Sequence, residues 1–338
     1  MYLEARAAAS IIETQLGLNA AGMAALAARL RELRPRAILT CARGSSDHAA
    51  TFARYLIATQ LGLLTASVAP SITSVYGVPQ QWHECVFLSI SQSGRSPDLI
   101  AAAQAARAAG AHVIALVNAG GSPLAECAHD VIAMHAGLET SVAATKSYLA
   151  SLSAIIQLVA SWADNARLER SLRDAPELLR RAWDMEWSEA LTPLSKATNA
   201  FVIGRGLGLT LAQEIALKLK ETCGLHAEAF SAAELRHGPM ALLRPGVPLL
   251  IVDQNDATHV GLEAVAREFA MRGVEVLYAG GIIAKQPGVT CLPCVAAPPL
   301  LAPLLQAQSF YRMANALAFA RGLDPDAPLL LSKVTETV

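Results

Sequence analysis

The sequence is poor in the features that mark exported, membrane-spanning or nucleic-acid-binding chains. Charged residues make up only 16% of its 338 residues and the formal net charge is -1, which gives no reason to expect nucleic acid or an anionic membrane as a partner. No apolar run reaches the roughly 18 residues of a membrane span. Glu4, Arg6 and Glu13 stand where a signal peptide needs an uncharged core, so we expect a cytoplasmic protein.

Paired cysteines are also scarce. The six cysteines are scattered, and Cys291 and Cys294 form the only close pair. A zinc site would need a second pair or nearby histidines, and neither is present. We therefore expect reduced thiols, no metal and no cofactor. With 53% hydrophobic residues, the chain can instead bury the cores of about two domains and a subunit interface.

One serine-rich stretch has the chemistry of an anion site. The apolar run 85–90 has the length of a strand and is followed by Ser91, Gln92, Ser93 and Gly94. Ser96 then suits a helix N-cap, and the proline after it suits the first helical position. Hydroxyls and unpaired backbone N–H groups would meet at a helix N-terminus, which favours phosphate. The alternative is an ordinary serine-rich loop.

Strands alternate with helices along the first half of the chain. Residues 1–35 and 47–61 favour helices, as do 98–109 and a long region, 143–187, that is broken near 164 and 174. We expect strands at 36–40, 64–68, 85–90, 111–117 and 130–134. This alternation predicts an α/β fold with a doubly wound parallel sheet flanked by helices.

The same pattern returns about 162 residues later. An apolar run leading into Arg205-Gly206 repeats the one leading into Arg43-Gly44, and the run 248–253 lies opposite 86–91 at the same offset. A third strand, 274–278, matches at an offset of 163. We interpret this as a tandem duplication. Where the first copy has Ser91, the second has Asp253, whose carboxylate would repel phosphate.

Candidate ligand-binding residues in the first copy lie in three stretches: 43–48, 91–98 and 139–146. In open α/β sheets, ligands bind beyond the carboxyl ends of the strands, so these stretches could converge there. Arg43 offers a fork of donors suited to phosphate or sugar oxygens. The binding candidates are Arg43, Gly44, Ser45, Ser46, Ser91, Gln92, Ser93, Ser96, Val142, Ala144, Thr145 and Ser332.

The second copy offers other chemistry, although each residue also has a structural explanation. Lys218 and Glu221 are three apart on a predicted helix, and that segment alone favours a surface ion pair. His237 lies beside a Gly-Pro turn, and Lys333 lies in a mostly uncharged tail. A dinucleotide site at 204–208 fails, because Leu209 stands where the third glycine should be.

Five motifs, taken together and in order, resemble the sugar isomerase (SIS) family, and more narrowly the isomerase half of glutamine:fructose-6-phosphate aminotransferase. They are Ser91-Gln-Ser-Gly94, Val142-Ala-Ala-Thr-Lys146, Leu217-Lys-Leu-Lys-Glu221, Glu234-Leu-Arg-His-Gly-Pro239 and Lys333-Val-Thr335. The resemblance implies two tandem SIS domains, at 36–160 and 198–320. N-terminal helices at 1–35, a helical linker at 161–197 and a C-terminal tail at 321–338 would complete the chain.

The resemblance also implies residue roles. Ser46, Ser91, Gln92, Ser93 and Ser96 would hold a sugar 6-phosphate. The catalytic set would be Lys333 as the Schiff-base lysine, Glu221 as the proton shuttle between C1 and C2, Lys218 as its assistant, and His237 as the ring-opening residue. A homodimer is implied, with His237 reaching the neighbouring subunit's site.

Departures from the family pattern shape the expected reaction. Arg43 stands where the synthase has a cysteine, Arg95 replaces an acidic residue, and Ala144 replaces a serine that touches the sugar. Because the sequence begins Met1-Tyr2-Leu3, we expect it to act without the synthase's glutaminase domain. The Arg43 and Arg95 variants are similar to stand-alone relatives that deaminate amino-sugar phosphates.

We therefore expect glucosamine 6-phosphate to be converted into fructose 6-phosphate and ammonia. The alternatives are another aminated sugar phosphate, amination of fructose 6-phosphate with free ammonia or a separate glutaminase, and a non-catalytic sugar-phosphate sensor.

Overall fold

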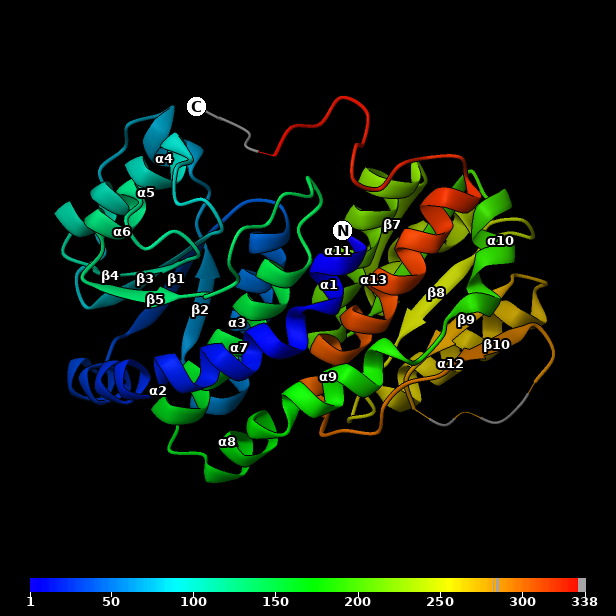
Figure 1. Ribbon diagram of the computed structural model, residues 1–338, viewed down its shortest axis with the longest axis horizontal. Coiled ribbons are helices and arrows are strands. Elements are labelled where there is room, and N and C mark those ends of the chain that lie inside the picture. The colour runs from blue at the N-terminus through cyan, green and yellow to red at the C-terminus, as the bar shows by residue number, and fades with distance from the viewer. Residues whose placement is uncertain (282, 284–285, 334–338) are drawn as a thin grey trace. The chain divides into compact units, whose positions relative to one another are not determined.

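The computed structural model describes residues 1–281, 283 and 286–333, which group into two compact units with one five-stranded sheet each (Figure 1). The first unit comprises Ser10–Glu139, Lys146–Asp174, Ser332 and Lys333. The second unit comprises Met1–Ala9, Thr140–Thr145 and Ala175–Leu331. Each unit is built from segments that are not contiguous in the chain. The domain limits expected from the sequence, which are contiguous, therefore stay a prediction.

The sheet of the first unit is entirely parallel, in the order β2-β1-β3-β4-β5. All five expected strands are present, with ends displaced by one residue or less. The strands are β1 (Ala37–Cys41), β2 (Leu64–Ser67), β3 (Cys85–Ser91), β4 (His112–Val117) and β5 (Asp130–Ala133).

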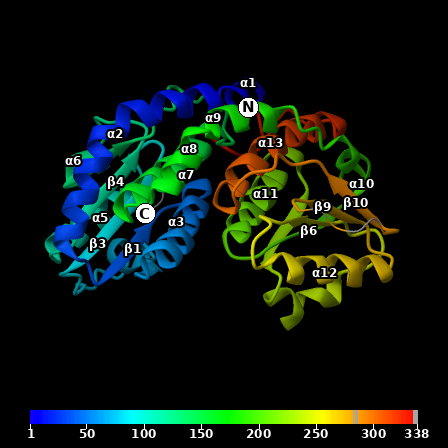
Figure 2. The ribbon, with the colours of Figure 1, turned by 90° about the horizontal axis from the view of Figure 1, so that it is seen from below.

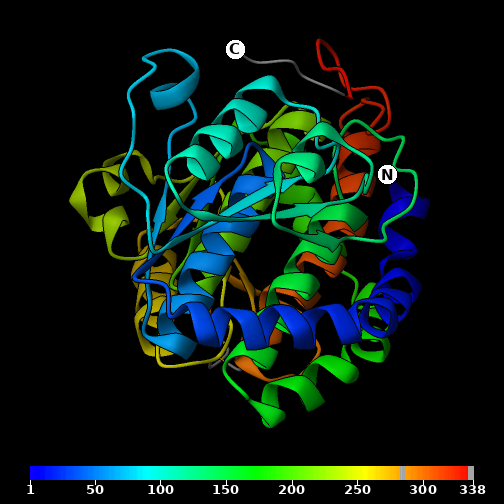
Figure 3. The ribbon, with the colours of Figure 1, turned by 90° about the vertical axis from the view of Figure 1, so that its left-hand side faces the viewer.

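Helices cover both faces of this sheet. In Figure 1, α5 and α6 lie on one face, and α3 and α7 on the other. The connection between β2 and β3, which carries α4, projects from the unit (Figure 3). Leu39, Phe87 and Val113 fill the core under α5. The helices are α2 (Ala8–Leu33), α3 (Ser45–Leu61), α4 (Ser71–Ser74), α5 (Pro97–Ala108), α6 (Pro123–Cys127), α7 (Lys146–Trp162) and α8 (Ala166–Arg173).

The second sheet repeats the first, with the order β7-β6-β8-β9-β10 and every pair parallel. Leu39 pairs with Phe87 in the first sheet, and Phe201 pairs with Leu249, 162 residues later, in the second. The sequence analysis did not identify two of these strands, β7 and β10. The strands are β6 (Asn199–Gly204), β7 (His226–Ser231), β8 (Leu249–Val252), β9 (Val276–Ala279) and β10 (Val289–Leu292).

The helices of the second unit also lie on two faces. Figure 2 shows α11 and α13 on one face of the sheet and α12 on the other. Phe201, Ile251 and Phe269 belong to the core beneath α12. The helices are α1 (Tyr2–Arg6), α9 (Ala175–Trp183), η1 (Ser188–Ala190), α10 (Leu191–Lys196), α11 (Leu207–Cys223), η2 (Glu234–His237), η3 (Pro239–Leu242), α12 (His259–Met271), η4 (Pro299–Leu301) and α13 (Ala302–Ala320).

The duplication extends to the helix ends. Gly44 precedes α3 with φ of 55°, and Gly206 precedes α11 with φ of 59°. Gly62 and Gly224 end the same two helices in the left-handed conformation. Glycine adopts these angles without the steric penalty of a Cβ atom, so the repeated glycines fix where both helices begin and end. In the part of the chain that is described, no helix has the length and apolarity to cross a membrane.

Candidate active site

The turn between β1 and α3 carries the first group of expected ligands. Gly44 is exposed and occupies the N-cap, and α3 begins at Ser45, two residues earlier than expected. Ser45 and Ser46 therefore lie in the first helical turn, both half-buried. Peptide dipoles at a helix N-terminus favour a bound anion, so this position suits the proposed phosphate.

The conformation of the loop after β3 is stabilised by hydrogen bonds to its own serine side chains. Ser91 is 5% exposed, and its Oγ accepts a hydrogen bond from the N–H of Gly94 at 3.1 Å. Ser93 Oγ accepts one from the N–H of Arg95 at 3.3 Å. Because each oxygen accepts from the backbone, its O–H remains a donor for an anion. Ser96 is the N-cap of α5, as expected, but its side chain makes no capping bond.

Gln92 contributes its backbone to the same loop. Its carbonyl accepts a hydrogen bond from the N–H of Asn118 at 3.3 Å, and the N–H of Leu124 donates to Gly94 O at 3.1 Å. The loop is thus fixed to the segment after β4. The amide side chain of Gln92 is half-buried at the same place.

Arg43 connects the two turns. Its Nε and Nη2 donate to Oδ2 of Asp98, at 3.0 and 2.7 Å. The Asp98 side chain is completely buried, and that of Arg43 is 50% exposed. The sequence analysis placed Arg43 among the ligands but did not foresee this bond, because Asp98 is 55 residues away in the chain.

The third expected stretch surrounds a buried carboxylate. Glu139 is 2% exposed, and its Oε1 and Oε2 accept from the N–H and Oγ of Ser147, at 3.2 and 2.6 Å. Lys333 Nζ lies 3.2 Å from Glu139 Oε2, within the same unit. Lys146 Nζ donates to Leu138 O at 2.5 Å. Lys333 is therefore paired with a buried carboxylate, a contact that was not expected from the sequence.

The remaining binding candidates are divided between the two units. Val142, Ala144 and Thr145 belong to the second unit, where the N–H of Thr140 donates to Glu4 Oε1 at 2.6 Å. Val142 and Ala144 are half-buried and Thr145 is buried. Ser332 is exposed and belongs to the first unit.

A chain of buried charges runs along α11. Lys218 is 1% exposed, and its Nζ lies 2.5 Å from Glu221 Oε2 and 3.5 Å from Glu214 Oε1. Tyr311 OH on α13 donates to Glu214 Oε1 at 3.0 Å. The surface ion pair favoured by the segment alone is therefore wrong, because the side chain of Lys218 is buried. Glu221 is the partly open end of the chain, at 22% exposure.

Sequence reasoning missed Glu214 and Tyr311. The spacing of 214, 218 and 221 along one helix face was visible in the sequence and could have pointed to Glu214. Tyr311 could not be found in this way, because its contact depends on how two helices pack. His237, at the end of η2, is exposed and precedes Gly238 with φ of 133°.

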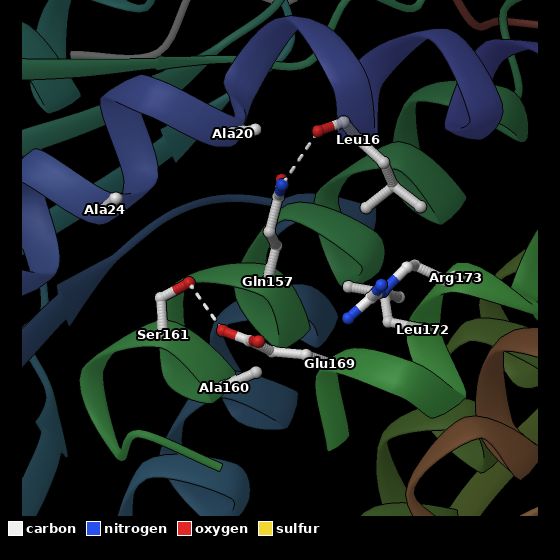
Figure 4. Close-up of a pocket in the computed structure, with 9 residues that line it drawn as sticks. All are labelled: Leu16, Ala20, Ala24, Gln157, Ala160, Ser161, Glu169, Leu172 and Arg173. Atoms are coloured by element: carbon white, nitrogen blue, oxygen red, sulfur yellow. Dashed lines mark hydrogen bonds between the residues drawn. The ribbon is translucent and has the colours of Figure 1, made fainter. Parts of the chain in front are cut away.

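A separate cavity in the first unit contains none of the expected site residues. It has a volume of about 280 Å³ between α2, α7 and α8 (Figure 4). Three of its polar side chains are bonded within the protein, since Gln157 donates to Leu16 O at 3.0 Å and Ser161 to Glu169 Oε1 at 3.5 Å. Among the described residues, no group of three or more His, Cys, Asp and Glu side chains is placed to hold a metal ion.

Comparison with known proteins places this arrangement in a family. Residues 33–161 and 193–288 match the model of the SIS domain. The chain belongs to the SIS domain family. Among solved SIS structures it is 37% identical to a protein of Silicibacter pomeroyi DSS-3 provisionally named a phosphosugar isomerase, with a TM-score of 0.90 over 96% of this chain and 98% of that one.

Two further SIS relatives carry more specific names. Glutamine–fructose-6-phosphate aminotransferase (isomerizing) of Aeropyrum pernix is 35% identical over 96% of this chain and 53% of its own length. The chain thus spans about half the length of that curated relative. A glucosamine-6-phosphate deaminase of Thermotoga maritima has a TM-score of 0.80 at 18% identity, over 99% of both chains, which shows a shared fold.

Proposed function

We propose that this SIS protein is a sugar-phosphate isomerase that deaminates glucosamine 6-phosphate to fructose 6-phosphate and ammonia. The single observation that carries the proposal is the buried Lys218–Glu221 pair on α11, which ends in a partly open carboxylate. The named relatives support the same class of chemistry, because they are phosphosugar isomerases, aminotransferases and deaminases. The proposed steps use only side chains of this protein and water.

The substrate's phosphate is assigned to the turns after β1 and β3. Ser46, Ser91, Ser93 and Ser96 can donate O–H groups, and two helix N-termini add favourable dipoles. Gln92 adds an amide. Holding the phosphate would fix one end of a six-carbon sugar while leaving its C1 and C2 for chemistry.

Glu221 is assigned the proton transfer between C2 and C1. Its Oε2 is held by Lys218 at 2.5 Å, so the other oxygen can act as the base. Glu214 in turn pairs with Lys218 and accepts a hydrogen bond from Tyr311, which favours one orientation of the Glu221 carboxylate. One carboxylate positioned over both carbons suits a 1,2-shift.

Lys333 is assigned the covalent step. An imine requires an unprotonated amine, and Glu139 Oε2, 3.2 Å from Nζ, can accept the proton. His237 is assigned the opening of the sugar ring. As the resemblance to the SIS family implies, we propose that it acts in the site of a second subunit of a homodimer, and its exposed position is compatible with that role.

The reaction balances with water as the only co-reactant. In the open-chain substrate, Glu221 takes the C2 proton and returns it to C1, while one proton of the amine passes to O1; the aldehyde and the amine thereby become a hydroxymethyl group and a C2 imine. The Lys333 amine adds to C2 and ammonia leaves. Water then hydrolyses the lysine imine, releasing fructose 6-phosphate and the free amine.

The first test is ammonia release from glucosamine 6-phosphate by the pure protein, with galactosamine 6-phosphate in parallel. We expect release from the first substrate, and no release from either would refute the proposal. Release from galactosamine 6-phosphate alone would support the proposed deamination but with galactosamine 6-phosphate as the substrate.

Lys333→Ala tests the mechanism. Removing the amine should lower turnover by at least about a thousandfold, as expected for loss of a nucleophile, and should abolish borohydride trapping of the substrate. Lys146→Ala is measured in parallel, because Lys146, whose Nζ donates to a backbone carbonyl, is the next candidate for the imine. Trapping that survives in Lys333→Ala would move the imine to another lysine.

The second candidate is the reverse reaction, amination of fructose 6-phosphate. It is favoured by the name of the Aeropyrum pernix relative. The measurement is formation of glucosamine 6-phosphate from fructose 6-phosphate with ammonium or with glutamine. Product with ammonium and none with glutamine would fit a chain that acts without a glutaminase.

A further inference from the structure

We infer that Asp98 is a positioning residue that anchors Arg43 as a donor to the substrate's phosphate. The inference rests on the proposed function, because it assumes that the turns after β1 and β3 hold a phosphate. It adds Asp98 to the site and gives Arg43 a defined task.

The geometry of the pair leaves donors available. A guanidinium group has five N–H donors in a rigid fork, and the two bonds from Nε and Nη2 to Asp98 use one edge of it. Half of the Arg43 side chain remains exposed. The donors on the other edge can therefore reach a ligand at the same two turns.

The position of the pair ties the two turns together. Arg43 directly precedes Gly44, the N-cap of α3, and Asp98 is the second residue of α5. β1 and β3 are neighbouring parallel strands, so these turns lie at the same edge of the sheet. A bond between the turns fixes the spacing of the serines on either side, which reduces the ordering needed when an anion binds.

Charge balance gives the pair a second effect. Asp98 is completely buried beside residues proposed to bind an anion, and its unpaired charge would oppose that binding. Asp47 adds another carboxyl group in the first turn of α3; burial raises its pKa, while the charges of His48 and Arg43 act in the opposite direction. Arg43 therefore neutralises a local excess of negative charge.

Arg95 provides a matched control within the same loop. It is exposed, and the bond recorded for it in the described structure is made by its backbone N–H, to Ser93 Oγ. If any nearby positive charge were enough, Arg43 and Arg95 would be equivalent. If the anchored fork matters, only changes at Arg43 and Asp98 should weaken phosphate binding.

The experiment compares Arg43→Lys, Asp98→Asn, the double variant and Arg95→Lys. Binding of inorganic phosphate is measured by calorimetry, and KM and kcat are measured with glucosamine 6-phosphate. We expect Arg43→Lys to raise both Kd and KM by about tenfold, the effect of losing one charge-assisted bond, with kcat changed less than threefold. Asp98→Asn should act in the same direction, and the double variant should be no worse than Arg43→Lys.

Thermal unfolding of each variant shows whether it is folded. If Arg43→Lys does not fold, the phosphate affinity of Asp98→Asn tests the inference instead. Wild-type phosphate affinity in both variants, or additive effects in the double variant, would overturn the inference. Arg95→Lys should remain within twofold of wild type, and an equal loss there would overturn it too. Phosphate binding is measured without turnover, so a result that depends on Arg43 would stand even if no ammonia were released.

Discussion

At the scale of single residues, Gly94 determines the shape of the serine loop. Its φ is 62°, a conformation that side chains rarely adopt. A Cβ atom placed there would lie 2.1 Å from Ser122 Oγ, and Ser122 is completely buried at the start of α6. Two independent restraints therefore require glycine at this position.

Gly94→Ala is expected to destabilise the protein by about 2–4 kcal/mol, because it combines backbone strain with a steric clash. Phosphate binding should weaken as well. The measurement is urea unfolding with and without inorganic phosphate. Gly120→Ala is the matched control, since a Cβ atom added at Gly120 would have open space within 4 Å. Adding Ser122→Gly to Gly94→Ala should recover part of the loss, and no recovery would contradict the clash.

At the scale of elements, the two copies treat the same loop in opposite ways. In the loop after β3, the serine O–H groups can donate hydrogen bonds to a ligand. In the loop after β8, the side chain of Asp253 supplies a negative charge. Asp253 is completely buried and accepts from the N–H of Asn255 at 2.7 Å and from Tyr278 OH at 2.8 Å. His259 Nδ1 lies 2.6 Å from the same carboxylate. An internal carboxylate thus occupies the position where the first copy is proposed to receive a phosphate.

Asp253→Asn should cost about 2–4 kcal/mol of stability, because an amide cannot accept from all of these donors and would leave buried groups unpaired. The loss should appear in thermal unfolding. Asp184→Asn, at an exposed position of the same unit, should change stability little. Burial and the charge of Asp253 hold the pKa of Tyr278 well above its usual range, so its OH stays a donor at all moderate pH values. A stable Asp253→Asn protein would show that the carboxylate is dispensable.

At the scale of the whole molecule, the assigned residues are divided between the two units. The serine loops, Glu139 and Lys333 belong to the first unit, and Lys218, Glu221 and His237 belong to the second. The resemblance to the SIS family led us to assign His237, which is exposed, to a neighbouring subunit's site. This assignment makes a homodimer part of the proposed mechanism.

Mixing two inactive variants tests that assignment. If His237 acts across the dimer, co-expressed His237→Ala and Lys333→Ala subunits form heterodimers in which one of the two sites is intact. With random pairing, half of the dimers are mixed, so about a quarter of wild-type activity should return. Ammonia release is the measurement, and each variant alone is the control. Background activity in confirmed heterodimers would contradict the shared site.

The duplication made much of the fold predictable. Five strands of the first copy and three of the second followed from apolar runs and turn residues. The missed strand β7 was recoverable, since 162 added to Leu64, where β2 begins, gives His226, where β7 begins. Its alternating charged and small residues hid it from a search for apolar runs. β10 has only four residues and lies at a sheet edge, where packing requires little apolar sequence.

By itself, the sequence determined the α/β class, the internal repeat and the residue types at the serine loop. The spacing of apolar residues, the residues that form turns and the positions of glycines are local properties of a sequence, so they can be recognised without the fold. Only the tertiary structure decided which charges are buried and with which partners. Lys218 and Glu221 are three residues apart, yet Glu214, which pairs with Lys218, is also bonded by Tyr311 of α13, nearly a hundred residues later. Arg43 with Asp98, and Lys333 with Glu139, are likewise pairs that folding creates, since no local pattern joins residues so distant in the chain.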